Sequence, residues 1–195
     1  KDLIMDDLET HNPSNVISFI GRTHGCYNGV NYSTIDYLEK PGKLKDNIRD
    51  NLLAPLIIAK ACQNYNKSNR FVHFTYLGTG CIFKYDKEHP FEEEFNGFNE
   101  KSKPNFFGSS YSIVKGFTDQ LMNMFGNNVL NLRIRMPITG TKNKRNFITK
   151  IVNYEKICSI KNSMTVLPEL LPFVIEMMKN NETGTINLTN PGLIS

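Results

Sequence analysis

The feature that most constrains the fold is a regular alternation of short apolar segments with longer segments of helical periodicity. The short segments are rich in β-branched and aromatic residues and are predicted to be strands, at 15–20, 71–77, 129–135 and 184–189. The longer segments are predicted to be helices, at 1–10, 43–65, 109–125, 146–156 and 164–181. This order indicates βαβ units and a mostly parallel sheet, so we predict a doubly wound α/β fold.

Local signals add detail to these segments. Pro55 lies inside the second helix and should kink it or remove one of its hydrogen bonds. Thr165 is a candidate N-cap for the last helix. The polar segment 25–42, rich in Tyr, Asn and Ser, is predicted to be a loop, and 81–107 is a long mixed segment.

In parallel sheets, ligands bind beyond the carboxyl ends of the strands. This rule points to four places, at 21–24, 78–81, 136–140 and 187–192. No glycine-rich loop of the GxGxxG type leads from a strand into a helix; the nearest text, LGTGC, precedes a loop. The chain begins with Lys1 rather than Met and ends soon after a strand. We therefore expect a Rossmann-like sheet that is truncated at both ends.

Composition excludes several classes of protein. The net charge is +4 and the basic residues are scattered, which argues against a nucleic-acid partner. The apolar runs are too short to span a membrane, and no segment resembles a signal peptide, so we expect a cytoplasmic protein. The four cysteines have no CxxC spacing, and the histidines form no evident ligand set, so we expect no metal site and no disulfide framework.

The strongest chemical signal is the motif YSIVK, at residues 111–115, near the start of a predicted helix. A spacing of four places Tyr111 and Lys115 on one helical face. An ammonium beside a phenol favours the phenolate, and we expect it to lower the pKa of Tyr111 from about 10. Such a tyrosine can donate a proton to a carbonyl that is being reduced. The motif alone is weak, because chance produces it often.

A set of longer motifs surrounds YSIVK in a fixed order: GTGCIFKYD, PNFFGSSYSIVKG, LRIRMPI, RNFITKI and NSMTVLPELLP. Together they resemble the extended short-chain dehydrogenase/reductase family, and within it the dTDP-4-dehydrorhamnose reductase branch. The resemblance is strongest to the plant and giant-virus enzymes that make UDP-L-rhamnose as 3,5-epimerases and 4-reductases, and it covers 15–195. It implies that 1–140 form the second part of a domain that binds NADPH or NADH. Residues 141–195 would then form a partial substrate-binding region with one returning strand.

The resemblance also implies roles for single residues. Tyr111 would donate a proton to the sugar C4 oxygen, and Lys115 would tune Tyr111 and hold the nicotinamide ribose. Thr79 would bind the ketone, and Cys81 and Lys150 would be the acid/base pair of the epimerisation. The residues lining the cofactor would be Tyr111, Lys115, Gly21, Arg22, Thr23, Asn51 and Pro137. The nucleotide-diphosphate sugar would be bound by Thr79, Cys81, Arg145 and Asn146.

Alternatives remain open at this point. One is a monofunctional dTDP-4-dehydrorhamnose reductase that depends on a separate epimerase. Another is a non-catalytic regulatory or binding subunit of the same fold, against which the presence of Tyr111, Lys115 and Thr79 argues. The sequence does not fix the nucleotide base or the choice of NADPH over NADH, and a homodimer is an open expectation.

Overall fold

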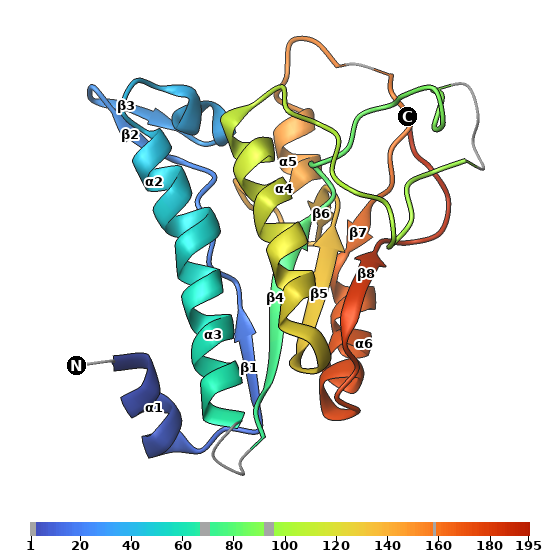
Figure 1. Ribbon diagram of the computed structural model, residues 1–195. Coiled ribbons are helices and arrows are strands. Elements are labelled where there is room, and N and C mark those ends of the chain that lie inside the picture. Colours follow the sequence, from blue (N-terminus) through green and yellow to red (C-terminus); the bar gives the residue numbers. More distant parts are fainter. Residues whose placement is uncertain (1–2, 67–70, 92–95, 158) are drawn as a thin grey trace.

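The computed structural model describes residues 3–66, 71–91, 96–157 and 159–195. At its centre is a four-stranded sheet with the order β1-β4-β5-β8, in which all neighbours are parallel. The strands are β1 (Asn15–Ser18), β4 (His73–Thr79), β5 (Val129–Ile134) and β8 (Gly184–Leu188). Their carboxyl ends point to the top of Figure 1. The predicted α/β fold with a parallel central sheet is confirmed.

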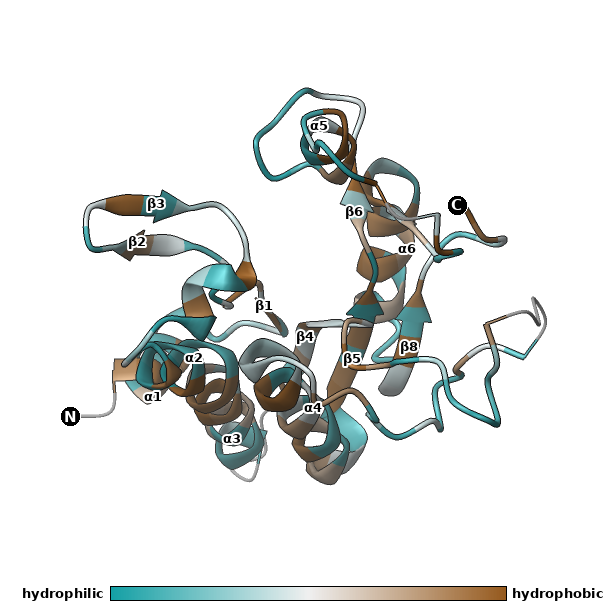
Figure 2. Ribbon diagram, turned by 90° about the horizontal axis from the view of Figure 1, so that it is seen from above, coloured by the Kyte–Doolittle hydropathy of each residue, from teal (hydrophilic) through white to brown (hydrophobic). Residues whose placement is uncertain are grey.

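Helices cover both faces of this sheet, as the view from above shows (Figure 2). One face carries α1 (Leu3–His11), α4 (Ser110–Met122) and a long helical stretch made of α2 (Leu44–Ile48), η2 (Arg49–Leu53) and α3 (Ala54–Asn66). The other face carries α6 (Leu167–Lys179). Among the described residues, no helix is both long and apolar enough to cross a membrane.

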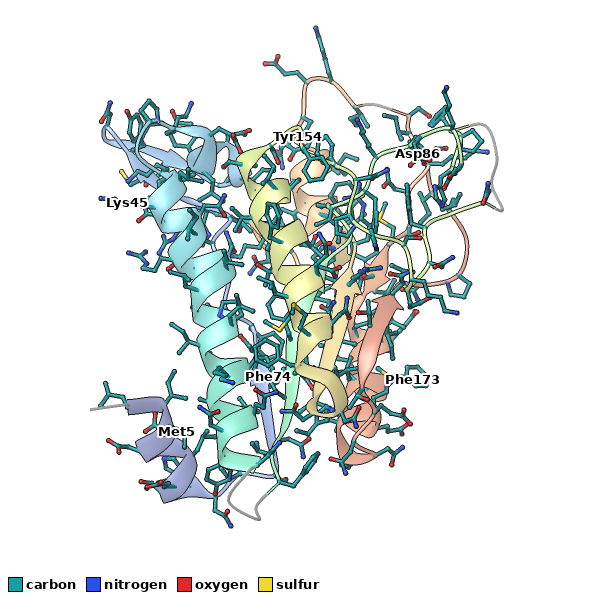
Figure 3. The ribbon with its side chains drawn as sticks, in the orientation of Figure 1. Met5, Lys45, Phe74, Asp86, Tyr154 and Phe173 are labelled. Carbon is teal, nitrogen blue, oxygen red and sulfur yellow. The ribbon has the colours of Figure 1, made fainter. Side chains whose placement is uncertain are left out.

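Two apolar cores lie between the sheet and its helices, one on each face. Successive side chains of β4 and β5 point to opposite faces and so belong to different cores. Phe74, Tyr76 and Val129 pack with α3 residues such as Ala59 and Cys62. The opposite face of β5 packs against α6 in a second core of Leu130, Leu132, Val174 and Leu188. Figure 3 shows Phe74 between the helices and the sheet, and Phe173 on the outer side of α6. The predicted strand and helix periodicities therefore describe real buried faces.

Pro55 removes one hydrogen bond from the long helical stretch, which is the second of the two predicted effects. The π-helical turn η2 ends at Leu53, two residues before Pro55. Proline has no N–H to donate, and its ring crowds the carbonyl four residues earlier, which here belongs to Asn51. The wider turn accommodates this crowding. The released carbonyl of Asn51 accepts a hydrogen bond from the Thr118 hydroxyl of α4 at 2.7 Å.

The segment 25–42 is not a simple loop, so that prediction was wrong. It contains an antiparallel hairpin of β2 (Gly25–Tyr27) and β3 (Val30–Tyr32), followed by the 3-10 helix η1 (Ile35–Glu39). Asn28 and Gly29 both have positive φ, 50° and 77°, as a two-residue hairpin turn requires. The Asn-Gly pair is the sequence signal that was overlooked.

Thr165 is not the N-cap of α6. It lies in β7 (Thr165–Val166), which pairs with β6 (Pro137–Ile138), and α6 begins at Leu167 without a side-chain cap. The Thr165 hydroxyl donates to Leu188 O at 2.7 Å and accepts from Arg135 N at 2.8 Å. The remaining helices are η3 (Asn123–Asn128) and α5 (Phe147–Ile151), the latter shorter than expected.

Candidate functional site

The carboxyl edge of the sheet brings together Thr79, Cys81, Tyr111 and Lys115. Thr79 ends β4, Cys81 follows it, and the other two lie in the first turns of α4, whose first turn is capped by the Ser109 hydroxyl. The Thr79 and Tyr111 hydroxyls are hydrogen bonded, and Cys81 N donates to Thr79 Oγ1 at 3.1 Å. The sequence therefore predicted a set of residues that the fold does assemble.

Tyr111 is almost fully buried, and burial raises its pKa, with a smaller upward effect of Cys81. The hydrogen bond from Thr79 and the charge of Arg135 oppose this rise. The direction is opposite to the lowered pKa expected from YSIVK. A raised pKa keeps the phenol protonated at neutral pH, which suits a group that must donate a proton.

Lys115 is also buried, and burial lowers its pKa to about 8, although Asp119 and Cys81 act to raise it. Its amine donates to the hydroxyl of Tyr76, a buried residue of β4, and lies 4.5 Å from the centre of that ring. Tyr76 was not identified from the sequence. Its place in the strand, three residues before Thr79 on the α4 side of the sheet, is the signal that could have indicated it.

Cys81 contacts a residue that the sequence reasoning also missed. Arg135 Nη1 donates to Cys81 Sγ at 2.7 Å, and the same side chain donates to Asn162 Oδ1. Arg135 directly follows β5, so its place beyond the carboxyl end of a central strand is the signal that was available. Next to it, Met136 has a φ of 42°, a left-handed conformation that is strained for a residue with a side chain.

A pocket of about 410 Å³ opens beside this group. Gly80, Arg135, Met136 and Asn162 contribute to its lining. A wall of rings from the segment after β4 completes it, formed by Phe83, Tyr85, His89, Phe91 and Phe98. Asp86, at the upper right of Figure 3, lies in the same segment. Aromatic faces beside a few polar groups are typical of small-molecule sites.

Lys150 belongs to a second, basic group. Burial lowers the pKa of His24, and the positive charges of Arg145, Arg22 and Lys150 lower it further. Arg145 Nη2 donates to His24 Nε2 at 2.9 Å and so joins the loop before α5 to the loop after β1. Within the described residues, no hydrogen bond links Lys150 to Cys81. The predicted pairing of these two residues stays a prediction.

Asn51 is buried and holds the loop after β1. Its side chain accepts from Arg22 N at 2.8 Å and donates to Arg22 O at 2.9 Å and Asn47 Oδ1 at 2.8 Å. Arg22 also forms an ion pair with Asp50. Asn51 therefore shapes the loop that holds Gly21, Arg22 and Thr23, and its predicted role at the cofactor stays a prediction.

Asn146 and Pro137, two other residues predicted to lie in the site, take part in the local secondary structure. Asn146 is buried, and its side chain caps α5 and donates to Thr139 O at 2.6 Å and Thr141 O at 3.0 Å. These bonds give Asn146 a structural role, and its predicted contact with the substrate stays a prediction. Pro137 lies in strand β6, paired with Thr165.

A buried ion pair supports the site from below. Arg133 of β5 and Asp119 of α4 are linked by Nε to Oδ1 at 2.8 Å and Nη2 to Oδ2 at 2.7 Å. Arg133 also donates to the carbonyls of Asn99 and Ser102 and so fixes the chain that leads to the aromatic wall. One turn earlier in α4 lies Lys115, whose charge Asp119 stabilises.

Comparison with known proteins gives the family context. No protein-family model matches the chain. The L780 protein of Acanthamoeba polyphaga mimivirus is 59% identical over 183 residues, which are 94% of this chain and 60% of that protein. A bifunctional dTDP-4-dehydrorhamnose 3,5-epimerase/dTDP-4-dehydrorhamnose reductase of Arabidopsis thaliana is 42% identical over 98% of this chain and 59% of its own length.

Solved structures agree. The crystal structure of L780, described as a UDP-rhamnose synthase, superposes with a TM-score of 0.87 at 56% identity and covers 98% of this chain and 63% of that one. A dTDP-4-dehydrorhamnose reductase of Bacillus anthracis in complex with NADP shares the fold, with a TM-score of 0.72 at 18% identity over 98% and 61%. The chain spans about 60% of the length of the curated relatives named above. Over that part, the chain is a homologue of these mimivirus and Arabidopsis proteins, and it shares its fold with the Bacillus anthracis reductase.

Proposed function

We propose that the protein to which these residues belong converts a nucleotide-linked 4-keto-6-deoxyglucose into the L-rhamnose nucleotide, as a 3,5-epimerase and a 4-ketoreductase. The observation that carries this proposal is the assembly of Thr79, Cys81, Tyr111 and Lys115 at one sheet edge, beside a pocket of sugar-binding size. Homology to the mimivirus and Arabidopsis proteins supports it.

The donor set fits the nicotinamide-ribose end of NADPH or NADH. Lys115 carries an amine that can bond ribose hydroxyls in place of Tyr76, and the loop 21–23 lies at the same edge of the sheet. When bound, a reduced nicotinamide supplies the hydride that C4 receives. The sequence has no glycine-rich strand-to-helix loop, so the proposal concerns this end of the cofactor only.

Epimerisation comes first in this proposal. The ketone at C4 acidifies the C–H bonds at C3 and C5, and the Thr79 hydroxyl donates a hydrogen bond to the ketone oxygen. Cys81 removes a proton from one face, and Lys150 returns a proton to the opposite face, which inverts the carbon. Lys150 lies in the basic group with Arg145, so substrate must lie between the two groups for both to act.

Reduction follows at the same ketone. Tyr111 is protonated at neutral pH because its burial disfavours the phenolate, and it gives its proton to the C4 oxygen. Lys115 remains largely protonated below pH 8 and stabilises the tyrosinate that results. The Lys115 ammonium loses its proton as the pH rises through about 8, and its charge no longer stabilises the tyrosinate. Reduction is therefore expected to slow above that pH.

The basic group of Arg22, Arg145 and Lys150 is the proposed anchor for the diphosphate of the substrate. Arg145 is exposed and presents a guanidinium that can bind phosphate oxygens in pairs. Residues 1–140 provide the cofactor side and 141–195 the substrate side in this scheme. A cytoplasmic location and a homodimer stay predictions.

The test separates the bifunctional enzyme from a simple reductase. The full natural chain is supplied with NADPH and either the 4-keto-6-deoxyglucose nucleotide or its 3,5-epimerised form. The proposal predicts NADPH oxidation with both. Oxidation with the epimerised form alone would leave a monofunctional reductase, and oxidation with neither would favour a binding subunit. A Tyr111→Phe variant should lose oxidation with both substrates.

A further inference from the structure

The Arg135 side chain bridges Cys81 and the chain around Asn162. Nε and Nη2 both donate to Asn162 Oδ1, at 3.0 and 2.8 Å, and Nη1 donates to Cys81 Sγ at 2.7 Å. The guanidinium is planar and its donors form a rigid fork, so the two bonds to Asn162 fix the direction of the third. Arg135 N is held as well, by Thr165 Oγ1 at 2.8 Å. The donor that faces the sulfur is therefore preorganised.

Other ionisable groups face Cys81 from the elements packed around it. Tyr111 and Lys115 of α4 interact electrostatically with the thiol. Tyr37 of η1 belongs to the same apolar cluster, with its hydroxyl committed to Asp46 at 2.8 Å. Within the described residues, Arg135 is the charged group that is hydrogen bonded to the sulfur. Arg135 and Gly80, the residue before Cys81, line the pocket, so the guanidinium that bonds the sulfur is itself part of the pocket wall.

We propose that Arg135 is the positioning residue of the epimerisation step: it holds the Cys81 sulfur beside the pocket that Arg135 lines and stabilises the thiolate that removes the proton. This inference rests on the proposed function. In the step, the C–H bond at C3 or C5 breaks and an S–H bond forms. The electron pair moves to the C4 oxygen as an enolate, and Lys150 returns a proton to the carbon. Arg135 only donates hydrogen bonds in this step and exchanges no proton, because a guanidinium is not deprotonated in proteins.

Alkylation of the Cys81 thiol measures the effect of Arg135 in the absence of substrate. The full natural chain is treated with iodoacetamide from pH 6 to 10, and alkylation of each cysteine is followed by peptide mass spectrometry. In Arg135→Met, alkylation of Cys81 at pH 7 is expected to fall roughly 10-fold or more, and its pH profile to move to higher pH, because a charge-assisted bond to the thiolate is lost. The exposed Cys26 is the internal reference and should react unchanged.

Two further variants separate charge from position. Arg135→Lys keeps the charge but cannot hold Asn162 and the sulfur together, so it should restore only part of the alkylation rate. Asn162→Ala keeps Arg135 and removes the residue that anchors it. Its Cys81 alkylation rate should lie between those of Arg135→Met and Arg135→Lys. Lys60→Met removes an exposed cation of α3 and should behave like the unchanged protein. Unchanged Cys81 alkylation in folded Arg135→Met would overturn the inference.

Activity gives the second readout. Deuterium exchange at C3 and C5 of the 4-keto-6-deoxyglucose nucleotide should fall roughly 10-fold to 100-fold in Arg135→Met. NADPH oxidation with the epimerised substrate should change much less, because Tyr111 does not depend on the sulfur. If the unchanged protein shows no exchange, the proposed function fails while the alkylation result still decides the role of Arg135. Equal loss of both activities in a folded variant would also overturn the inference.

Discussion

The buried ion pair between Asp119 and Arg133 allows a quantitative prediction. Their side chains are 4% and 2% exposed. Asp119 accepts two bonds from Arg133 and a third from Asn131 Nδ2 at 2.8 Å. Removing one partner of a buried, hydrogen-bonded pair leaves a charge with no counterion and costs about 3–5 kcal/mol. Asp119→Asn should lie near the lower value, since Arg133 keeps the carbonyls of Asn99 and Ser102.

The assay is urea unfolding followed by circular dichroism, on the unchanged protein, Asp119→Asn, Arg133→Met and an Asp119→Asn/Arg133→Met double variant. Each single variant should unfold at lower urea with an unchanged slope, which reports lost stability rather than a changed unfolded state. The double variant should cost less than the sum of the singles, because it leaves no unpaired charge. Single costs below about 1 kcal/mol, or additive costs, would refute the reasoning.

Other predictions follow from single contacts. Leu132→Ala should lower the free energy of unfolding by about 2–5 kcal/mol in urea titrations, because the Leu132 side chain is fully buried. Phe173→Ala, on the exposed side of α6, should change the free energy of unfolding by about 0.5 kcal/mol or less. Equal costs for the two variants would contradict the assigned core. Thr118→Val should cost about 1–3 kcal/mol by leaving the carbonyl of Asn51 without its donor, and an unchanged urea midpoint would count against the account of the π-helical turn. Lys115 has a lower pKa folded, about 8, than unfolded, 10.5, so its burial cost is fully present below pH 8 and declines as the pH rises to 10.5. The stability of Lys115→Met relative to the unchanged protein should therefore fall between pH 7 and pH 10 in urea titrations, and a constant difference would mean that the shift is absent.

The sequence was sufficient for the elements that depend on periodicity. Strands such as Val129–Ile134 and helices such as Ser110–Met122 have apolar faces that alternate with the period of their backbone, and these faces became the two cores. The rule on strand ends then placed Thr79 and Cys81 at the correct edge. Local features were harder: the Asn28–Gly29 turn was overlooked, and Pro55 predicted a lost hydrogen bond but not the π-helical turn that accompanies it.

The site was predicted less completely than the fold. Residue type and spacing identified Tyr111 and Lys115, but the direction of the Tyr111 pKa depends on burial, which is a tertiary property. Tyr76 and Arg135 were missed because their roles arise from contacts across the sheet, with Lys115 and with Cys81. The hydrogen bonds of the Asn146 amide to the backbone around Thr139 likewise depend on the tertiary fold, so spacing alone did not indicate them.

The measurement that tests the central claim most directly is proton exchange without cofactor. The full natural chain is incubated in heavy water with the 4-keto-6-deoxyglucose nucleotide, and deuterium at C3 and C5 is followed by NMR. The account predicts exchange that disappears in Cys81→Ala and persists in Tyr111→Phe, since the first residue breaks the C–H bond and the second acts in reduction. Exchange that survives in Cys81→Ala, or that is absent from the unchanged protein, would contradict it.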